Sequence, residues 1–162
     1  MPRIVRLAGG DLLGTLAVMD PKRRRLTNRC SGVAAVVAFV TQPIPGGDEL
    51  IVVPVHYWLV ARMAKGRGAR LRDMPWRSIQ KIIWYGAGAR LVANFSLGLV
   101  PVVGAFSNSI TAIALTEFLA RWLDVYIANP DQPPPEVTMD GLKRVFADAL
   151  EKKPTAPEAA VI

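Results

Sequence analysis

Side chains that can perform catalysis or hold a metal are scarce in this chain, which has one histidine, His56, and one cysteine, Cys30. Metal sites need several clustered ligands, and a hydrolytic triad needs a histidine beside a nucleophile and a carboxylate. His56 is interpreted as a packed side chain, and for Ser107 and Ser109, which lie in an apolar segment, a helix start is the simpler explanation. We therefore predict no catalytic residue, no metal site and no enzyme activity.

A nucleotide cofactor would need a glycine-rich loop before a helix, as in the pattern GxxxxGK[ST]. The glycines between residues 86 and 104 do not form this pattern. Between Arg90 and Arg121 there is also no lysine or arginine that could neutralise a phosphate. The sequence therefore predicts no cofactor.

Positive charge is the binding chemistry that the sequence offers most clearly, because the formal net charge is +7. Residues 1–30 hold seven Lys or Arg against two Asp, and residues 62–90 hold eight against one Asp. Such a distribution is expected of segments that face the cytoplasm or an anionic lipid surface. The candidates for binding lipid head groups or an acidic partner are Lys22, Arg23, Arg24, Arg25, Arg67, Arg70 and Arg72.

Nucleic acid is the other partner that basic segments commonly bind. The aromatic residues lie inside apolar stretches and do not alternate with the arginines, so the sequence disfavours nucleic acid. Two interpretations of the run 22–25 stay open. One is a solvated linker, and the other is a patch that contacts phosphate.

Two apolar tracts, 31–61 and 91–116, make up much of the chain, and each is interrupted near its centre. Each arm is shorter than the about 20 apolar residues that cross a bilayer. Proline forces the preceding residue out of the α region, and glycine lets the chain turn sharply. The predicted turn residues are Pro43, Pro45, Gly46, Gly47, Pro101 and Gly104. Each tract is therefore expected to form an apolar helical hairpin.

The predicted fold is all-α, with the two apolar helical hairpins packed as a bundle and an amphipathic helix after them. Valines favour a strand over 33–40, but the alanines there favour a buried helix, which we predict. Further helices are expected over 11–19, where Asp20-Pro21 ends the helix, and over 49–64, 75–97, 107–128 and 138–151, with Pro54 as an alternative start for the second of these. The last helix is expected to be capped by Thr138 and to dock on the core or on a partner. The predicted regions are a basic N-terminal segment with a short helix (1–29), the hairpin domain (30–128), and a Pro-rich spacer, amphipathic helix and disordered tail (129–162).

Several polar residues in these helices have predicted partners. Asp48 is expected to cap the helix that follows it, with Glu49 in the first turn. The small residues 86–89 are expected to let another helix approach closely. The polar groups Asn94, Asn108 and Thr111 are expected to hydrogen-bond across helices, and Glu117, Arg121 and Asp124 to form an intrahelical ion pair.

From about residue 30 to residue 127 the order of these features resembles a bacterial family. The residues that carry the resemblance are the Ala/Val run ending in Pro43-Ile44-Pro45, the pair Asp48-Glu49, the apolar helix 53–63, the segment 99–104 and the closing helix with Thr116-Glu117. The family is a helical domain of unknown function, found at the C-terminus of Era-like or dynamin-like GTPases and in stand-alone proteins associated with the inner membrane. The resemblance implies a helical fold and a membrane or GTPase context, although this chain carries no GTPase domain.

The sequence thus predicts a non-enzymatic helical module that associates with the cytoplasmic face of a bacterial inner membrane and acts by binding. Its expected partners are an anionic membrane surface, into which the hairpins insert or against which they pack, and a GTPase or other protein. Two alternatives stay open. One is a soluble cytoplasmic adaptor whose apolar helices are buried by a partner or in a homo-oligomer. The other is an assembly or scaffold component whose basic face meets an acidic partner.

Overall fold

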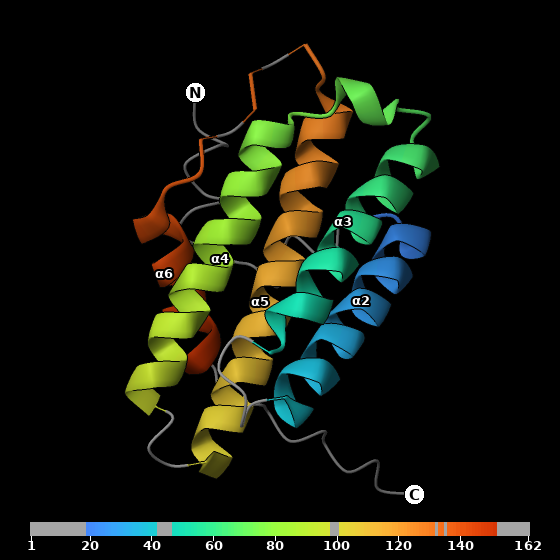
Figure 1. The fold of residues 1–162 in the computed structure, drawn as a ribbon. Coiled ribbons are helices and arrows are strands. Elements are labelled where there is room, and N and C mark those ends of the chain that lie inside the picture. The colour runs from blue at the N-terminus through green and yellow to red at the C-terminus, as the bar shows by residue number, and fades with distance from the viewer. Residues whose placement is uncertain (1–18, 42–46, 98–100, 132, 135, 152–162) are drawn as a thin grey trace, which may run out of the picture.

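The computed structural model describes residues 19–41, 47–97, 101–131, 133–134 and 136–151, with the backbone alone for 93–97 and 101–103 (Figure 1). Throughout these residues the elements are helical and no strand is present. They are α2 (Pro21–Val40), α3 (Glu49–Gly66), the 3-10 turn η2 (Leu71–Asp73), α4 (Trp76–Leu97), α5 (Pro101–Ala128) and α6 (Met139–Glu151). The predicted all-α fold is confirmed, and the helix predicted for 11–19 lies outside the described residues.

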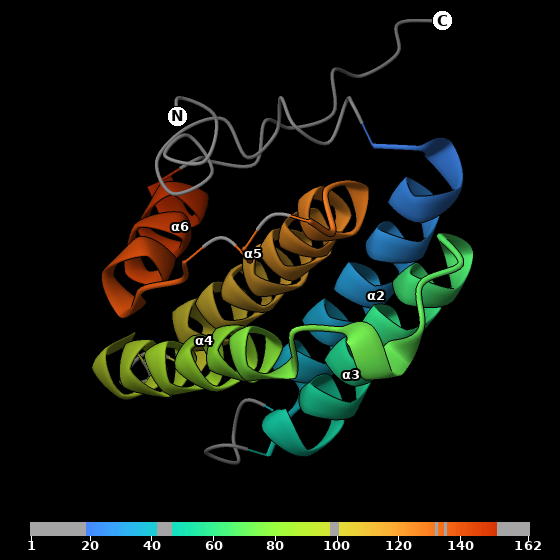
Figure 2. The same ribbon diagram turned by 90° about the horizontal axis from the view of Figure 1, so that it is seen from above.

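The two predicted hairpins are α2 with α3 and α4 with α5 (Figure 1). α5 is the central helix, because it packs against each of the other four (Figure 2). α2 and α3 lie on one side of α5, and α4 and α6 lie on the other. The bundle is thus built around the most apolar long helix of the chain.

α2 begins earlier than the sequence predicted. Asp20 is its N-cap and accepts a hydrogen bond from the Lys22 backbone N–H at 2.9 Å, while Pro21 occupies the first turn. Both residue types are favoured at these positions. The basic run 22–25 is therefore part of a helix and not a linker, and α2 crosses the domain boundary predicted at residue 30.

α3 starts at the predicted residue, Glu49, whereas the start of α5 corrects the prediction. Asp48 occupies the N-cap position of α3 but makes no side-chain cap hydrogen bond, and Pro54 lies inside the helix. α5 begins at Pro101, six residues before the predicted start, so Gly104 lies inside a helix and not in a turn. Gly47 does lie in the turn before α3. The other predicted turn residues, Pro43, Pro45 and Gly46, lie outside the described residues.

α4 and α5 approach closely at Gly86, as the small residues there predicted. A Cβ atom added to Gly86 would lie 2.4 Å from Leu115 Cδ1, a distance that real Cβ atoms do not show. Gly88, one half-turn further on, has no atom within 4 Å of the same position. Only Gly86 is therefore required for the contact between these two helices.

The buried residues form two clusters. The larger contains residues of all five helices, including Leu59, Ile82 and Leu119, and the smaller contains Ala34, Ala38, Val52 and Ala112. α6 is capped by Thr138, whose Oγ1 accepts from the Gly141 N–H at 3.1 Å. Its buried face of Leu142, Val145 and Phe146 joins the larger cluster, so α6 docks on the core, which is one of the two predicted alternatives.

Candidate functional site at the two ends of the bundle

The hairpin geometry brings segments of similar chemistry to the same end of the bundle. The corner end consists of the last turns of α2 and α4 and the first turns of α3 and α5 (Figure 1). The basic end consists of the first turns of α2 and α4, the last turns of α3 and α5, and η2. Each end therefore combines residues that are far apart in the sequence.

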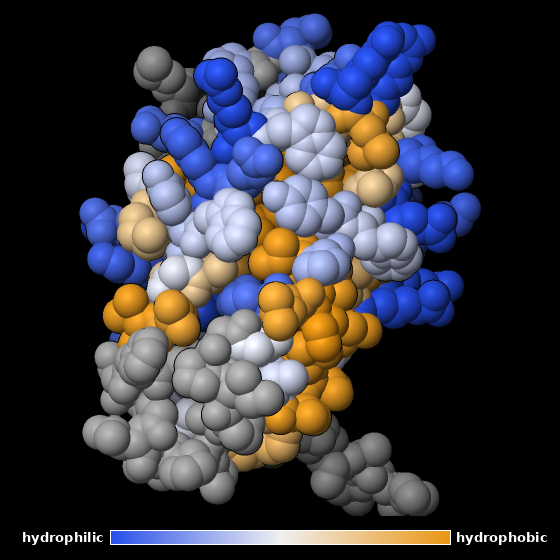
Figure 3. Space-filling view, viewed as in Figure 1, coloured by the Kyte–Doolittle hydropathy of each residue, from blue (hydrophilic) through white to orange (hydrophobic). Residues whose placement is uncertain are grey.

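The corner end has an apolar surface. Val36, Val40 and Leu50 are 64%, 68% and 81% exposed, and Phe39 stacks edge-on against the exposed ring of Phe106 at a centroid distance of 5.6 Å. The lower part of Figure 3 shows this surface as a continuous apolar patch over α2 and α3. Exposed apolar patches of this kind mark interaction surfaces.

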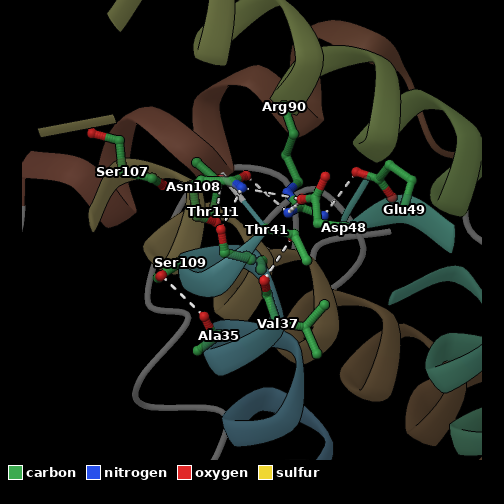
Figure 4. Close-up of polar contacts among 12 residues, drawn as sticks. Ala35, Val37, Thr41, Asp48, Glu49, Arg90, Ser107, Asn108, Ser109 and Thr111 are labelled. Atoms are coloured by element: carbon green, nitrogen blue, oxygen red, sulfur yellow. Dashed lines mark hydrogen bonds and ion pairs between the residues drawn. The ribbon is translucent and has the colours of Figure 1, made fainter. Parts of the chain in front are cut away.

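The corner half consists of residues 31–56 and 84–116 of the hairpins, and its charged side chains lie together, with Asp48 and Arg90 buried and Glu49 partly exposed. Within residues 31–56 and 84–116 only Asp48, Glu49 and Arg90 carry a charge. Arg90 is fully buried, and it pairs with Asp48 through Nη2 and with Glu49 Oε1 through Nη1 at 2.9 Å (Figure 4). The apolar surface around them therefore has no fully exposed charge among its described residues.

Asn108 of α5 completes this cluster. Its Oδ1 accepts from Arg90 Nη2 at 2.9 Å, and its Nδ2 donates to the Ala38 carbonyl at 3.0 Å and to Asp48 Oδ2 at 3.1 Å (Figure 4). The predicted cross-helix hydrogen bond of Asn108 is thus confirmed. Thr111 instead donates within α5, to the carbonyls of Ser107 and Asn108, because its hydroxyl lies close to the preceding turn.

The cluster holds one cation and two carboxyl groups. Burial raises the pKa of the Glu49 carboxyl, Arg90 opposes that rise, and the Asp48 carboxylate adds to it. Arg90 and Asp48 form a buried ion pair, which is costly to break because one charge would remain without a partner. In proteins that enter lipid, ionisable residues typically face the interior and pair in this way.

The sequence analysis did not identify this cluster, because it assigned Asp48 to a helix cap and gave Arg90 no partner. The signal was present in the charge pattern. Residues 31–56 and 84–116 contain one cation, Arg90, and two adjacent acids, Asp48 and Glu49, so these groups have no other charge there to pair with. Burial of the tracts against one another then requires the three charges to meet.

His56 is a packed side chain, as predicted. It is fully buried, and its Nε2 lies 3.0 Å from Thr116 Oγ1. Thr116 donates its own proton to the Ala112 carbonyl at 2.8 Å, which assigns the imidazole proton to Nε2. Burial lowers the pKa of His56 to about 3, and the positive charge of Arg90 contributes to the decrease.

The basic end contains a cleft between α2 and α3 of about 770 Å³. Six lysines and arginines line it, namely Lys22, Arg23, Arg25, Arg29, Arg62 and Lys65. Three of them belong to the predicted head-group residues, and three were not identified from the sequence. Arg29 lies one helical turn after Arg25 on α2, whereas Arg62 and Lys65 belong to α3 and join the cleft through the pairing of α2 with α3.

The other predicted head-group residues lie outside the cleft. Arg67 pairs with Asp124 of α5 at 3.1 Å, and Arg23 pairs with the same Asp124 oxygen at 3.1 Å. Arg24, Arg70 and Arg72 are exposed, with Arg72 3.5 Å from Asp73. The structure therefore brings Lys22, Arg23 and Arg25 into one cleft and leaves the rest as a looser basic surface.

The acidic residues of α5 divide between two partners. Glu117 lies 3.8 Å from Arg121 within the helix, as predicted, and burial raises the pKa of the Glu117 carboxyl while Arg121 opposes the rise. Asp124 was expected to join this intrahelical pair. It points instead toward α2 and α3, because the ends of those helices present Arg23 and Arg67 to it.

Within the described part of the chain, no group of three His, Cys, Asp or Glu side chains could hold a metal ion. Among the same residues, no helix combines the length and the hydropathy needed to cross a bilayer. Cys30 is buried, and burial raises the pKa of its thiol to about 11.

Comparison with known proteins gives no relative. No family model, no curated protein and no solved structure matches this chain. The resemblance to the GTPase-associated helical domain therefore stays a prediction, and the geometry of the two ends carries the functional argument.

Proposed function

We propose that this chain is a non-enzymatic membrane-binding module whose corner end enters one leaflet while its basic end stays among anionic head groups. The observation that carries the proposal is the buried pairing of Arg90 with Asp48 and Glu49. Within residues 31–56 and 84–116 these are the only charged residues, and exposed valine, leucine and phenylalanine surround them. A polar rim of exposed charge would be expected if this end faced water alone.

The uncharged zone is the part of the four hairpin helices between the corner end and their first charged residues outside the cluster. Its depth supports the proposal. Moving from the corner end, the first charged residues outside the cluster are Arg29 on α2, Arg62 on α3, Lys81 on α4 and Glu117 on α5. At 1.5 Å per residue they lie about 16 Å, 20 Å, 24 Å and 24 Å from the helix ends. One leaflet contributes about 15 Å of hydrocarbon and about 5 Å or more of head-group region. The zone thus matches a single leaflet.

α6 limits the depth of insertion, because it packs on α4 and α5 and runs toward their corner end in Figure 1. Lys143, Arg144 and Asp148 are exposed on its outer face, and charges at hydrocarbon depth would oppose insertion. The buried residues of α6 all belong to the larger core cluster, and none belongs to the smaller cluster of the corner half. We expect the cytoplasmic leaflet to be the one entered, because anionic lipids are concentrated there.

Vesicle flotation tests the proposal. The variant Val36→Asp with Val40→Asp puts two charges on exposed positions of the corner end, and Leu71→Asp puts one on an exposed apolar residue of the basic end. Each charge in hydrocarbon costs about 2.5 kcal/mol or more. On phosphatidylcholine vesicles with a quarter phosphatidylglycerol in 1 M NaCl, we expect the wild type and Leu71→Asp to float and the double variant to bind at least about 100-fold more weakly.

Two results would contradict the proposal. One is release of the wild type by salt alone, which indicates a purely electrostatic adaptor. The other is a stable dimer in analytical ultracentrifugation that Val36→Asp with Val40→Asp dissociates, without any vesicle binding by the wild type. That result would favour the soluble alternative, in which self-association buries the corner end.

A further inference from the structure

The cleft between α2 and α3 has more specific chemistry than a basic surface. Its six cations face Asp20 as the only acidic lining residue, and the Asp20 carboxylate already accepts the Lys22 backbone N–H. Within the described residues, only Arg23 among the six has a carboxylate partner, Asp124. Lys22, Arg25, Arg29, Arg62 and Lys65 therefore supply an excess of positive charge in a concave site.

One wall of the cleft is aromatic. Trp58 is half-exposed, and the Arg62 guanidinium lies over its ring at 5.5 Å from the centroid. Such cation–π contacts hold the guanidinium in place. Arg62 is thus positioned at the cleft wall, while Leu26 and the indole of Trp58 provide apolar surface beside it.

We propose that this cleft binds a phosphate monoester, carried at the membrane by a lipid head group of the phosphatidic acid type. A volume of about 770 Å³ is typical of a small-molecule site. Guanidinium groups match pairs of phosphate oxygens, and a dianion compensates several cations better than a singly charged diester does. The apolar wall suits the glycerol carbons next to the phosphate.

That the phosphate monoester is carried by a lipid rests on the proposed membrane function. The affinity of the cleft for a phosphate monoester does not rest on that function. Along α2 the cleft lies toward the basic end, at the depth where a module inserted by its corner end would meet head groups. A free phosphate monoester would satisfy the same cations. The experiment therefore has a soluble arm and a vesicle arm.

Two double variants that remove the same charge test the site. Arg25→Ala with Arg29→Ala alters the cleft, and Arg70→Ala with Arg72→Ala alters the exposed basic surface outside it. All four side chains are exposed, so both variants are expected to fold, which circular dichroism checks. If binding were a diffuse electrostatic attraction, both variants would weaken it equally. If binding occurs in the cleft, only Arg25→Ala with Arg29→Ala weakens it.

In the soluble arm, glycerol 3-phosphate is titrated into protein without membranes while tryptophan fluorescence is followed. We expect a saturable change that disappears in Trp58→Phe and weakens about tenfold in Arg25→Ala with Arg29→Ala. In the vesicle arm, phosphatidic acid and phosphatidylglycerol vesicles are matched in surface charge. We expect the wild type to prefer phosphatidic acid about tenfold, and only the cleft variant to lose this preference.

The outcomes separate the two proposals. Binding of glycerol 3-phosphate without vesicle binding supports the cleft and contradicts the membrane function. Vesicle binding by the wild type with no preference for phosphatidic acid, and no response to glycerol 3-phosphate, overturns the cleft and leaves the membrane function standing. The cleft proposal is also overturned if the two double variants lose the preference for phosphatidic acid equally. Tight binding of a single-stranded oligonucleotide, without binding of glycerol 3-phosphate or phosphatidic acid, overturns it as well.

Discussion

Arg90 and Asp48 lie 42 positions apart in the sequence and form a buried ion pair inside the corner half of the bundle. Arg90 comes from α4 and Asp48 precedes α3, so the pair joins the two hairpins. Asn108 of α5 bonds both of them and also the last turn of α2 through the Ala38 carbonyl. One cluster therefore connects all four hairpin helices and keeps the charges of Asp48 and Arg90 away from the surface.

We expect Arg90→Ala to lower the free energy of unfolding by about 3–5 kcal/mol, because Asp48 would stay buried without its partner. Urea titration of the protein in buffer measures this change. The double variant Asp48→Asn with Arg90→Met removes both charges and is expected to recover at least about 1 kcal/mol of the loss. A double variant less stable than Arg90→Ala would show that the pair does not act as a unit.

The stability of the protein is expected to fall at acid pH because of His56. Burial lowers its pKa to about 3, well below the usual value of about 6.5. Below pH 6.5 the unfolded chain therefore binds a proton that the folded chain does not bind, and folding becomes less favourable as the pH falls toward 3. The largest contribution is about 1.4 kcal/mol per pH unit.

His56→Gln isolates this effect, because Gln can still donate to Thr116 but does not titrate. Burial also raises the pKa values of Glu49 and Glu117, and these groups oppose the trend by binding protons more tightly in the folded state. Both proteins share that contribution. Between pH 6.5 and 4.5 the unfolding free energy of the wild type should therefore fall more steeply than that of His56→Gln. Parallel curves would contradict the assignment.

Two glycines of α4 provide a matched pair for the contact between α4 and α5. Gly86→Ala places its Cβ on Leu115, which is fully buried, so we expect a loss of about 1–3 kcal/mol from overpacking. Gly88→Ala meets no atom and should raise stability by about 0.5–1 kcal/mol through helix propensity. Thermal unfolding of both variants checks the prediction, and equal effects would contradict the close approach at Gly86.

The Cys30 thiol is expected to be inert in the folded protein. It is 2% exposed, and its pKa of about 11 leaves about 100-fold less thiolate at pH 8 than the ordinary value of 9.0. Ellman's reagent should react rapidly with Leu71→Cys and slowly with Cys30 until urea is added. Rapid reaction of both thiols in buffer would show that the α2 contact around Cys30 opens easily.

Sequence reasoning identified the helices, their pairing into hairpins and the docked amphipathic helix. These features depend on local signals, namely the Pro/Gly interruptions, the small residues around Gly86 and the cap at Thr138. Helix starts were less predictable, because Asp20-Pro21 was interpreted as the end of one helix and proved to be the start of another. The same pair of residue types favours both outcomes.

The candidate site was predictable only in part. Lys22, Arg23 and Arg25 stand out because they are close in the sequence, and Arg29 follows one helical turn later, whereas Arg62 and Lys65 join them only through the packing of α2 on α3. The partner of Arg90 likewise depends on the register between two hairpins. Contacts of this kind depend on tertiary geometry, which residue spacing along one helix does not specify.

The most direct test of the membrane account is the depth of two positions in bound protein. Val36→Cys at the corner end and Leu71→Cys at the basic end are both exposed, and each can carry a fluorescent label because Cys30 is buried. On vesicles containing anionic lipid, we predict that lipids brominated near the bilayer centre quench the label at position 36 and that aqueous iodide quenches the label at position 71. Iodide quenching of vesicle-bound position 36, without quenching by the brominated lipids, would contradict the account.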